Sequence, residues 1–343
     1  MNRPLLVLGI GSLLSSLAAC GDDAGSGGSD TTSTSTSNAS SSGSNASSQQ
    51  SSSGSSQGGN NPGGGGGGGG MPDCSNLPTA EVTPVLETDL FSGSEDIGFD
   101  GAGNIVGKSG NEIIAVDASD VSTPVANLSG QAYGLRYGIT GDLFVARPNL
   151  GTIVRIAGDG TVTDFATGLS GPNGVYPDLD GNVWVTEFGG GNVLKLDAMG
   201  MSTEIATGQN SPNGVVYDPT RDVVFFTQYG PGKIMRVGAD GAGMPVEVID
   251  IPNAALDGLA MDVCGNVYAV DNGMNRLFRV DLDAAGDSTG AEVLLATFPS
   301  NVANAQFGSG AGWEPTSMYA AGNPGDVYSV PVGVAGAPVP TVP

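Results

Sequence analysis

The sequence predicts an all-β protein, a six-bladed β-propeller whose last blade is completed by an N-terminal strand. Three observations predict this fold: a repeated strand–turn–strand unit, a spacing near 40 residues between most units, and one leftover strand ahead of the first unit. A four-stranded propeller blade has about this length. The repeated turns are Gly103-Asn104-Ile105, Gly141-Asp142-Leu143, Gly181-Asn182-Val183, Arg221-Asp222-Val223, Gly265-Asn266-Val267 and Gly325-Asp326-Val327.

The third unit shows all four expected strands. Val175 opens the inner strand, and turn residues separate it from three further apolar runs. These runs cover residues 183–186, 193–196 and 203–205. Short β-branched and apolar runs bounded by Gly, Asn and Asp are typical of an antiparallel blade.

One position in each unit is of particular interest, because a repeat that stacks around an axis brings equivalent positions together. It lies eight residues before each turn, and successive positions are 38, 40, 40, 44 and 60 residues apart. In chain order the residues are Glu95, Tyr133, Asn173, Asn213, Asp257 and Ser317. Four of them carry the carboxylate or amide oxygens that Ca²⁺ prefers. The alternative is that Asn and Asp are simply favoured by strand-entry turns.

The ring is expected to close through residues 79–91, which form one strand that belongs to no unit. The sixth unit ends in a proline-rich segment, and proline cannot donate a hydrogen bond to a strand ladder. The last blade therefore lacks an outer strand of its own. Pairing with the N-terminal strand would supply it and remove an exposed edge.

The N-terminus resembles a bacterial lipoprotein signal peptide. Arg3 precedes an apolar run from Leu5 to Leu14, and Leu17-Ala18-Ala19-Cys20 follows. We expect residues 1–19 to be removed, Cys20 to be acylated, residues 20–73 to form a disordered Ser/Gly/Asn-rich linker, and residues 74–343 to form the propeller. An ordinary signal peptide is the alternative. The protein is then expected in the bacterial cell envelope, lipid-anchored at the outer membrane and facing either side.

The net charge limits the classes of partner, and the cysteine count limits the possible disulfides. The formal net charge is −24, which disfavours nucleic acid and favours cations and neutral small molecules. We expect a monomer. Once Cys20 carries lipid, Cys74 and Cys264 remain, and in an exported protein they form either one disulfide or two free thiols.

The phrases Gly171-Pro172-Asn173-Gly174-Val175, Ser211-Pro212-Asn213-Gly214-Val215 and Leu256-Asp257-Gly258-Leu259 resemble the regucalcin/gluconolactonase family, which is related to the paraoxonases. The resemblance implies a six-bladed propeller with a divalent cation in its central channel. It also implies metal ligands at Glu95, Asn213 and Asp257, with Asp257 able to act as a base, and contact of Asn173 with metal or substrate. The chain departs from the family at Glu95, which is not followed by Gly-Pro.

The residue types favour one cation, most simply Ca²⁺. The chain has no histidine, which excludes a paraoxonase-like or virginiamycin-lyase-like histidine base and the usual zinc site.

Fourteen residues after the key positions lie Arg147, Glu187, Thr227 and Asp271. We expect Glu187 and Asp271 to orient water or hydroxyl groups as further catalytic residues.

Substrate contacts are expected from Tyr133, Arg147, Asn173 and Ser317. The sequence thus predicts a calcium-dependent hydrolase of lactones or esters, in which the metal polarises the carbonyl and Asp257 or Glu187 accepts a proton from water. The alternative is a non-catalytic propeller of the NHL type that acts as an envelope binding module.

Overall fold

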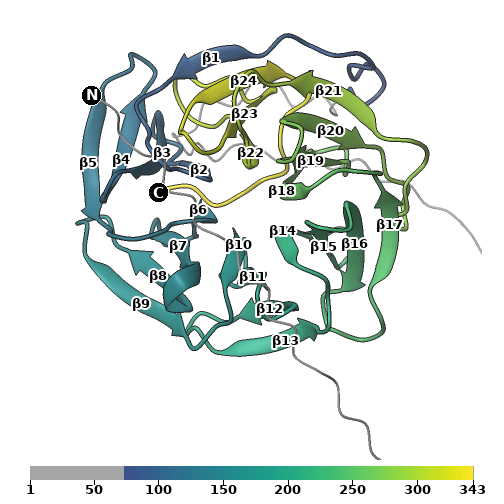
Figure 1. Cartoon of the computed structure of the whole chain (residues 1–343), viewed down its shortest axis with the longest axis horizontal. Helices are drawn as coiled ribbons and strands as arrows, with labels where there is room; N and C mark the ends of the chain where they lie inside the picture. Colours follow the sequence, from purple (N-terminus) through teal and green to yellow (C-terminus); the bar gives the residue numbers. More distant parts are fainter. Residues whose placement is uncertain (1–72, 343) are drawn as a thin grey trace, which may run out of the picture. The chain divides into compact units, whose positions relative to one another are not determined.

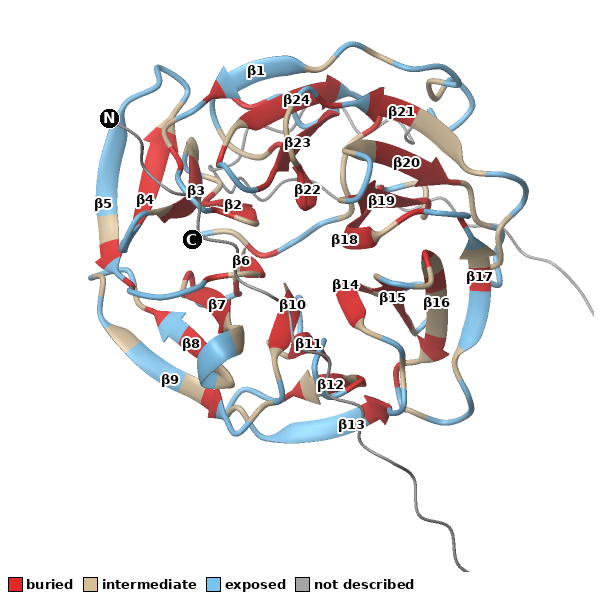
Figure 2. Ribbon diagram, in the orientation of Figure 1, coloured by how far each residue is buried: buried red, intermediate tan, exposed pale blue. Residues whose placement is uncertain are grey.

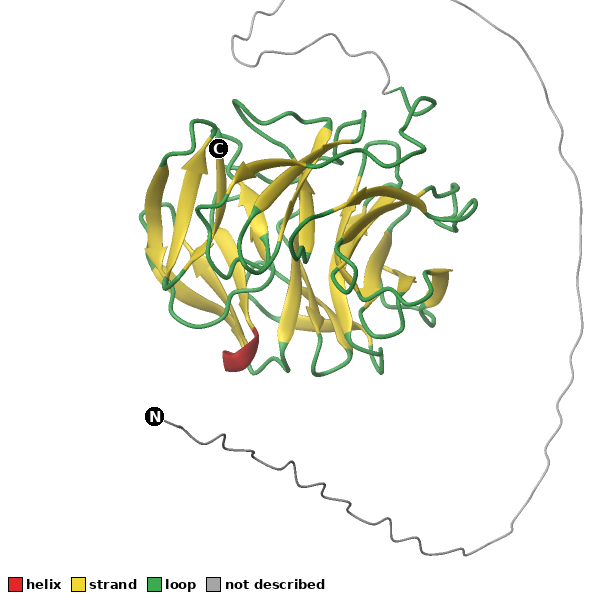
Figure 3. Cartoon of the chain, turned by 45° about the horizontal axis from the view of Figure 1, so that its top comes forward, coloured by secondary structure: helices red, strands yellow, loops and turns green. Residues whose placement is uncertain are grey.

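The structure is a computed structural model that describes residues 73–342. These residues form six four-stranded antiparallel sheets arranged around a central axis, so the predicted six-bladed β-propeller is confirmed (Figure 1). Figure 3 shows that almost every regular element is a strand; one 3₁₀ turn, η1 (Pro148–Leu150), is the exception among the described residues. The predicted signal peptide, Cys20 and residues 20–72 of the predicted linker lie outside the described range.

In blades one to five the first strand of the blade lies nearest the axis (Figure 1). Blade one comprises β2 (Ile97–Phe99), β3 (Asn104–Ser109), β4 (Glu112–Asp117) and β5 (Ser122–Asn127). Blade two comprises β6 (Leu135–Tyr137), β7 (Leu143–Arg147), β8 (Thr152–Ile156) and β9 (Val162–Thr167). Blade three comprises β10 (Pro172–Pro177), β11 (Val183–Glu187), β12 (Asn192–Leu196) and β13 (Ser202–Ala206). Blade four comprises β14 (Pro212–Asp218), β15 (Val223–Gln228), β16 (Lys233–Gly238) and β17 (Val246–Asp250). Blade five comprises β18 (Leu256–Met261), β19 (Val267–Asp271), β20 (Arg276–Val280) and β21 (Val293–Thr297).

Blade six closes the ring in the way the sequence predicts. Its strands are β22 (Asn304–Phe307), β23 (Ser317–Ala321), β24 (Val327–Pro331) and, outermost, the N-terminal β1 (Val85–Thr88). Leu86 of β1 lies opposite Tyr328 in an antiparallel pair. Only four residues of the expected 79–91 segment are strand, and three of those four side chains are exposed, so β1 contributes chiefly backbone pairing.

The register of the sixth unit differs from the prediction. Its Gly325-Asp326-Val327 turn joins β23 to β24, whereas the matching turns in the other blades join the first strand to the second. The true inner strand is β22, which a longer connection links to β23. Ser317 therefore opens the second strand, and its carbonyl accepts the Gly308 N–H at the turn end of the blade. The sixth inner-ring position is Ala303, which accepts the Gly258 N–H through its carbonyl as Asn173 accepts the Gly134 N–H.

A repeated aspartate turn explains why the first strand of a blade returns so tightly. In blade three, Asp178 accepts hydrogen bonds from the backbone of Asp180 and Asn182 and from the indole Nε1 of Trp184. The same capping recurs at Asp100, Asp218 and Asp262. A carboxylate that accepts several backbone N–H groups pre-forms the turn.

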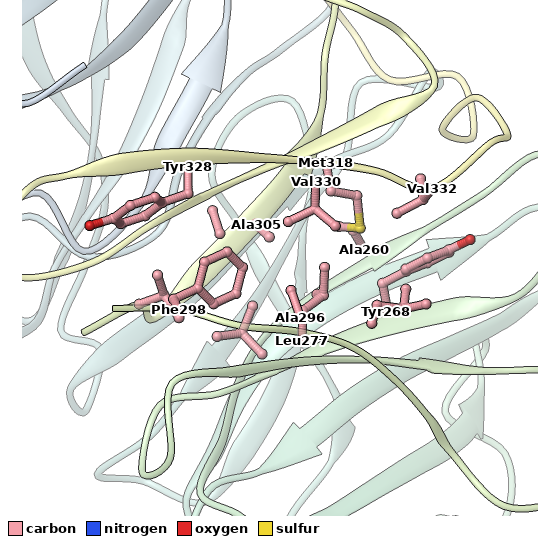
Figure 4. Close-up of a cluster of buried hydrophobic side chains, with 14 residues drawn as sticks. Ala260, Tyr268, Leu277, Ala296, Phe298, Ala305, Met318, Tyr328, Val330 and Val332 are labelled. Atoms are coloured by element: carbon pink, nitrogen blue, oxygen red, sulfur yellow. The ribbon is translucent and has the colours of Figure 1, made fainter. Parts of the chain in front are cut away.

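Apolar side chains between neighbouring blades form the core. The cluster between blades five and six includes Leu277, Phe298, Met318 and Val330, all buried (Figure 4). Burial falls from the inner strands outward, and the outer strands such as β13 are mostly exposed (Figure 2). Burying apolar surface at every blade interface is the main force holding the ring together.

Two further connections secure the turn end of the channel. Cys74 and Cys264 form a disulfide, which settles the alternative left open by the sequence. The C-terminal segment runs across the same end (Figure 1), where Ala337 N–H bonds to the Met261 carbonyl and Val342 N–H to the Asp100 carbonyl. Within residues 73–342, no helix has the length and apolar character needed to cross a membrane.

Removal of β1 should destabilise the propeller. A chain that starts at Ser92 lacks β1 and exposes the edge of β24, so its Tm should fall by at least about 5 °C, or it should aggregate. A chain that starts at Asp73, with Cys74→Ser and Cys264→Ser, is the matched control because it lacks only the disulfide. Thermal melts with equal Tm for the two chains would show that blade six is stable without the N-terminal strand.

Candidate active site

A backbone irregularity positions the key side chains of blades three, four and five. The pairing of each inner strand with its neighbour shifts register at the same place: between Pro172 and Val175, and at the equivalent points of β14 and β18. Such bulges redirect a side chain away from the regular alternation. The residues within them are Asn173-Gly174, Asn213-Gly214 and Asp257-Gly258.

Glycine is required after Asn173, Asn213 and Asp257 because neighbouring blades approach closely there. A Cβ on Gly174 would overlap the backbone oxygen of Asn213, and one on Gly214 would overlap that of Asp257. The glycine N–H groups instead bond to Thr186 and Thr227, which are fully buried. Each threonine hydroxyl then donates to the carbonyl of the key residue in the next blade, Thr186 to Asn213 and Thr227 to Asp257.

The sequence placed Thr227 in one ring with Glu187 and Asp271. The pairing shows instead that Thr227 matches Thr186, because Gln228 pairs with Pro212 as Glu187 pairs with Pro172. The one-residue offset arises from an extra residue in the β14–β15 hairpin. The threonine link between blades is thus a functional feature that the sequence analysis missed; the signal was a threonine near the end of the second strand in two successive units.

Two carboxylates belong to the ring, Glu95, which is half-buried, and Asp257, which is buried. Glu95 and Asp257 come from blades one and five, and Asp257 is 4% exposed. Burial raises the pKa of Glu95 to about 8, with a further contribution from the charge of Asp96. Burial raises the pKa of Asp257 well above its ordinary value, and the charges of Glu95 and Asp96 add to the rise. The charge of Glu95 acts on Asp257, so the two side chains are close enough to interact.

The surrounding polar side chains complete the site. Asn213 donates a side-chain hydrogen bond to the Asp257 carboxylate, and Asn173 is 7% exposed at the equivalent position of blade three. Burial raises the pKa of Tyr133, as do the charges of Glu95 and Asp257, so the phenol lies near these carboxylates. The structure therefore brings together five of the six ring positions predicted from sequence, with Ala303 in place of Ser317 at the sixth.

These donors fit a divalent cation. Glu95 Oε2 is buried and has no hydrogen-bond partner among residues 73–342, which leaves a buried acceptor without a donor there. Leaving a buried carboxylate unpaired is costly unless a positive charge compensates it. Two carboxylates and two amide oxygens match the preference of Ca²⁺. Among residues 73–342, no three His, Cys, Asp or Glu side chains cluster as a metal site, so the amides are essential to this assignment.

A cavity of about 370 Å³ opens above the ring. Its walls include Glu95, Tyr133 and Ala303, and its rim is rich in amide side chains from Gln131, Asn272, Asn301 and Asn323. Lys108 is the one basic residue among its lining side chains. The volume and the convergence of polar groups are typical of a small-ligand site.

The two predicted outer carboxylates hold loops in place. Glu187 accepts the Ser170 N–H at 2.7 Å and the Asn192 side-chain amide at 2.6 Å. Asp271 accepts the Ala255 N–H at 2.8 Å and forms an ion pair with Arg276. Both therefore tie the entry loop of a blade to its second strand. Both carboxylate oxygens of each residue are engaged, so we assign them a positioning role around the site.

Arg147 occupies the equivalent place in blade two. Its Nη2 donates to the Ser129 carbonyl at 2.7 Å, and it forms no ion pair with a carboxylate of residues 73–342. A Cβ on Gly130, a residue of the cavity wall, would lie 3.7 Å from that Nη2. Arg147 is thus at the rim of the cavity.

Below the ring, Arg136 closes the channel. It contacts the Asp96 carboxylate of blade one and donates to the Asn304 side chain of blade six at 3.3 Å. Both partners belong to blades whose key residue is not followed by glycine. The buried ion pair and this hydrogen bond link blades one, two and six below the ring.

Comparison with known proteins confirms the fold. No family model and no curated protein matches the chain. Among solved structures, a gluconolactonase from Xanthomonas campestris is 18% identical, with a TM-score of 0.61, over 73% of this chain and 89% of that chain. Regucalcin from Agrobacterium tumefaciens, described as calcium-binding, is 17% identical, with a TM-score of 0.61, over 77% and 99%.

A catalytically inactive virginiamycin B lyase from Staphylococcus aureus, solved with quinupristin, is 18% identical, with a TM-score of 0.54, over 70% of this chain and 80% of that chain. At identities this low, the structural match shows only that the fold is shared. The resemblance seen in the sequence is therefore confirmed at the level of a gluconolactonase- and regucalcin-like six-bladed propeller.

Calcium should stabilise the folded protein. Binding to the folded state alone adds about 2.7 kcal/mol at one hundred times the Kd. Asp257→Asn should reduce this shift strongly because it removes one of two charged ligands, whereas Tyr133→Phe should leave it nearly unchanged. Thermal melts of each variant with calcium and with chelator make the measurement. An identical wild-type melt in both conditions would mean that the ring side chains are only strand-entry turn residues.

The metal-free protein should lose stability as the pH rises. The pKa of Glu95 is raised from 4.5 to about 8 in the folded state, so between these pH values the folded protein holds a proton that the unfolded chain releases. The unfolding free energy should therefore fall from pH 5 to pH 8 in chelator. Urea unfolding of wild type and Glu95→Gln tests this, and a slope equally steep in Glu95→Gln would assign the effect to other groups.

Proposed function

We propose that this protein is a calcium-dependent hydrolase of small lactones or esters. The observation that carries the proposal is the pair of ring carboxylates, Glu95 and Asp257, of which Glu95 lines the 370 Å³ cavity and has an Oε2 atom without a hydrogen-bond partner among the described residues. Glu95, Asn173, Asn213 and Asp257 would hold the cation. The gluconolactonase and regucalcin structures of the same fold support this choice of activity over other hydrolases.

The bound cation would polarise the substrate carbonyl and acidify a water molecule. The protein supplies the remaining steps. The Asp257 carboxylate accepts the proton of the attacking water, and the Asn213 amide fixes its orientation through their hydrogen bond. Tyr133 borders the cavity, where its hydroxyl can donate to a ring or ester oxygen of the substrate.

The shape of the channel supports a small substrate. Arg136 and the C-terminal segment close the opposite end, so substrate and product must share the opening above the ring. Glu187 and Asp271 keep the entry loops of blades three and five fixed around that opening. Fixed walls hold a bound substrate in one orientation, which lowers the entropy cost of reaching the reactive geometry.

A second candidate function is non-catalytic binding on the opposite end. There, an apolar cavity of about 450 Å³ lies between the turns of blades three, four and five. Tyr176, Tyr217, Met261, Val263 and Pro338 are among its walls. An exposed apolar hollow of this kind is typical of a binding surface. It shares no lining residue with the cavity above the ring.

We propose that the protein acts as a monomer outside the cytoplasm, anchored through an acylated Cys20. The Cys74–Cys264 disulfide supports an oxidising compartment, because such bonds rarely persist in a reducing cytosol. The segment that carries the proposed anchor lies outside the described residues.

Hydrolysis should depend on both calcium and Asp257. We expect proton release from simple γ- and δ-lactones in calcium, loss of activity in chelator, and a decrease of at least about 100-fold in kcat/KM for Asp257→Asn, since metal binding and proton transfer both suffer. Asp262→Asn is the control for the loss of a buried carboxylate, because Asp262 lies in a turn and does not line the cavity above the ring. Equal activity with and without calcium would exclude the metal-dependent mechanism.

A further inference from the structure

The cavity above the ring contains a buried cation, Lys108, that forms no ion pair with a carboxylate of residues 73–342. Lys108 lies at the end of β3 and is 7% exposed. Its ammonium group donates to the Gly110 carbonyl, and its backbone N–H donates to the Ser94 hydroxyl at 2.9 Å. Burial lowers the pKa of the Lys108 ammonium. A charge held in this way is stabilised by any anion that enters the cavity.

This lack of a partner is unusual within the described chain. Of its ten lysine and arginine residues, seven form ion pairs with Asp or Glu: Arg136, Arg155, Arg221, Lys233, Arg236, Arg276 and Arg279. Lys195 stacks over the Trp184 ring. The two that remain are Lys108, in the cavity wall, and Arg147, at its rim. Among residues 73–342, the cations without an ion-pair or ring partner are thus one residue that lines the cavity and one that lies next to it.

The charge balance of the site also favours an anionic ligand. With calcium bound, its two positive charges offset Glu95 and Asp257, and Lys108 leaves one positive charge over. One anionic group on the ligand would neutralise it. Long-range repulsion from the acidic surface is screened within about 8 Å at physiological salt, so the local charge of the cavity decides.

The neighbouring side chains favour a carboxylate as that group. Phosphate and sulfate sites commonly use arginine forks or several backbone N–H groups. Here a single ammonium is accompanied by amides, including Gln131, Asn301 and Asn323. Such a set suits one carboxylate next to hydroxyl or carbonyl oxygens.

We propose that the substrate of this site is a lactone or ester that carries a free carboxylate, and that Lys108 binds this carboxylate. The proposal rests on the hydrolase function proposed above and replaces the neutral substrate expected from net charge. Lys108 is then a specificity-determining residue, because it acts on the non-reacting end of the substrate and leaves the chemistry to the ring.

The test uses two lactones of matched shape, 5-oxotetrahydrofuran-2-carboxylate and its neutral carboxamide. Their kcat/KM values and Kd values are measured in calcium for wild type, Lys108→Met and Lys108→Arg. Wild type should favour the carboxylate by about tenfold or more, and Lys108→Met should bring the ratio near one while the carboxamide values change less than twofold. Lys108→Arg should retain part of the preference. Lys195→Met, which removes a lysine on blade three, should leave the ratio unchanged.

The outcomes separate this inference from the hydrolase function. If neither lactone is hydrolysed but the carboxylate still binds about tenfold better through Lys108, the hydrolase fails and anion recognition by the cavity stands. A wild-type ratio near one, or a preference that survives in Lys108→Met, overturns the role of Lys108 whatever the activity. Calorimetric titration supplies the Kd values without turnover, and thermal melts confirm that each variant is folded.

Discussion

The close approach of neighbouring inner strands is the constraint on which the site depends. Gly134 N–H donates to the carbonyl of Asn173 in the next blade, and Gly258 N–H donates to that of Ala303. At the two intervening junctions a buried threonine hydroxyl makes the same link. The backbones of Asn173, Asn213, Asp257 and Ala303 are therefore fixed by the blade before them. Because a Cβ would obstruct this approach, glycine follows the key residue wherever the link forms.

The same local chemistry determines how far the sequence could predict the structure. Units one to five could be aligned because each turn is short and fixes the distance back to the key residue, as the Asp178 turn does through its backbone hydrogen bonds. The sixth inner strand ends in a longer connection and has Asn304, not glycine, after Ala303. Its neighbour β23 precedes a Gly-Asp turn that imitates the repeat, which is why Ser317 was assigned to the ring. The pairing of β1 could be predicted because an incomplete blade has only one free edge to fill.

Side-chain roles were harder to predict than positions. Glu187 and Asp271 lie near the end of the second strand, as expected, but their partners Ser170 and Ala255 are backbone groups of entry loops whose conformation no residue pattern announces. Lys108 carries no sequence signal, since an exposed lysine at a strand end is common. Its importance follows only from its burial and from the cavity that it shares with Glu95.

The ring is chemically unequal, and this inequality gives the channel a direction. Blades one and five provide the carboxylates Glu95 and Asp257, whereas blades three and four provide the amides Asn173 and Asn213. Where the glycine is missing, in blades one and six, Asp96 and Asn304 bind Arg136 instead, and this arginine closes the channel below the carboxylates. Its positive charge is neutralised by Asp96 and so cannot replace a cation at Glu95, whose Oε2 lacks a partner. A cation held by the ring would thus have protein beneath it and open coordination positions only on the side of the cavity, where Lys108 and the amides can select what approaches.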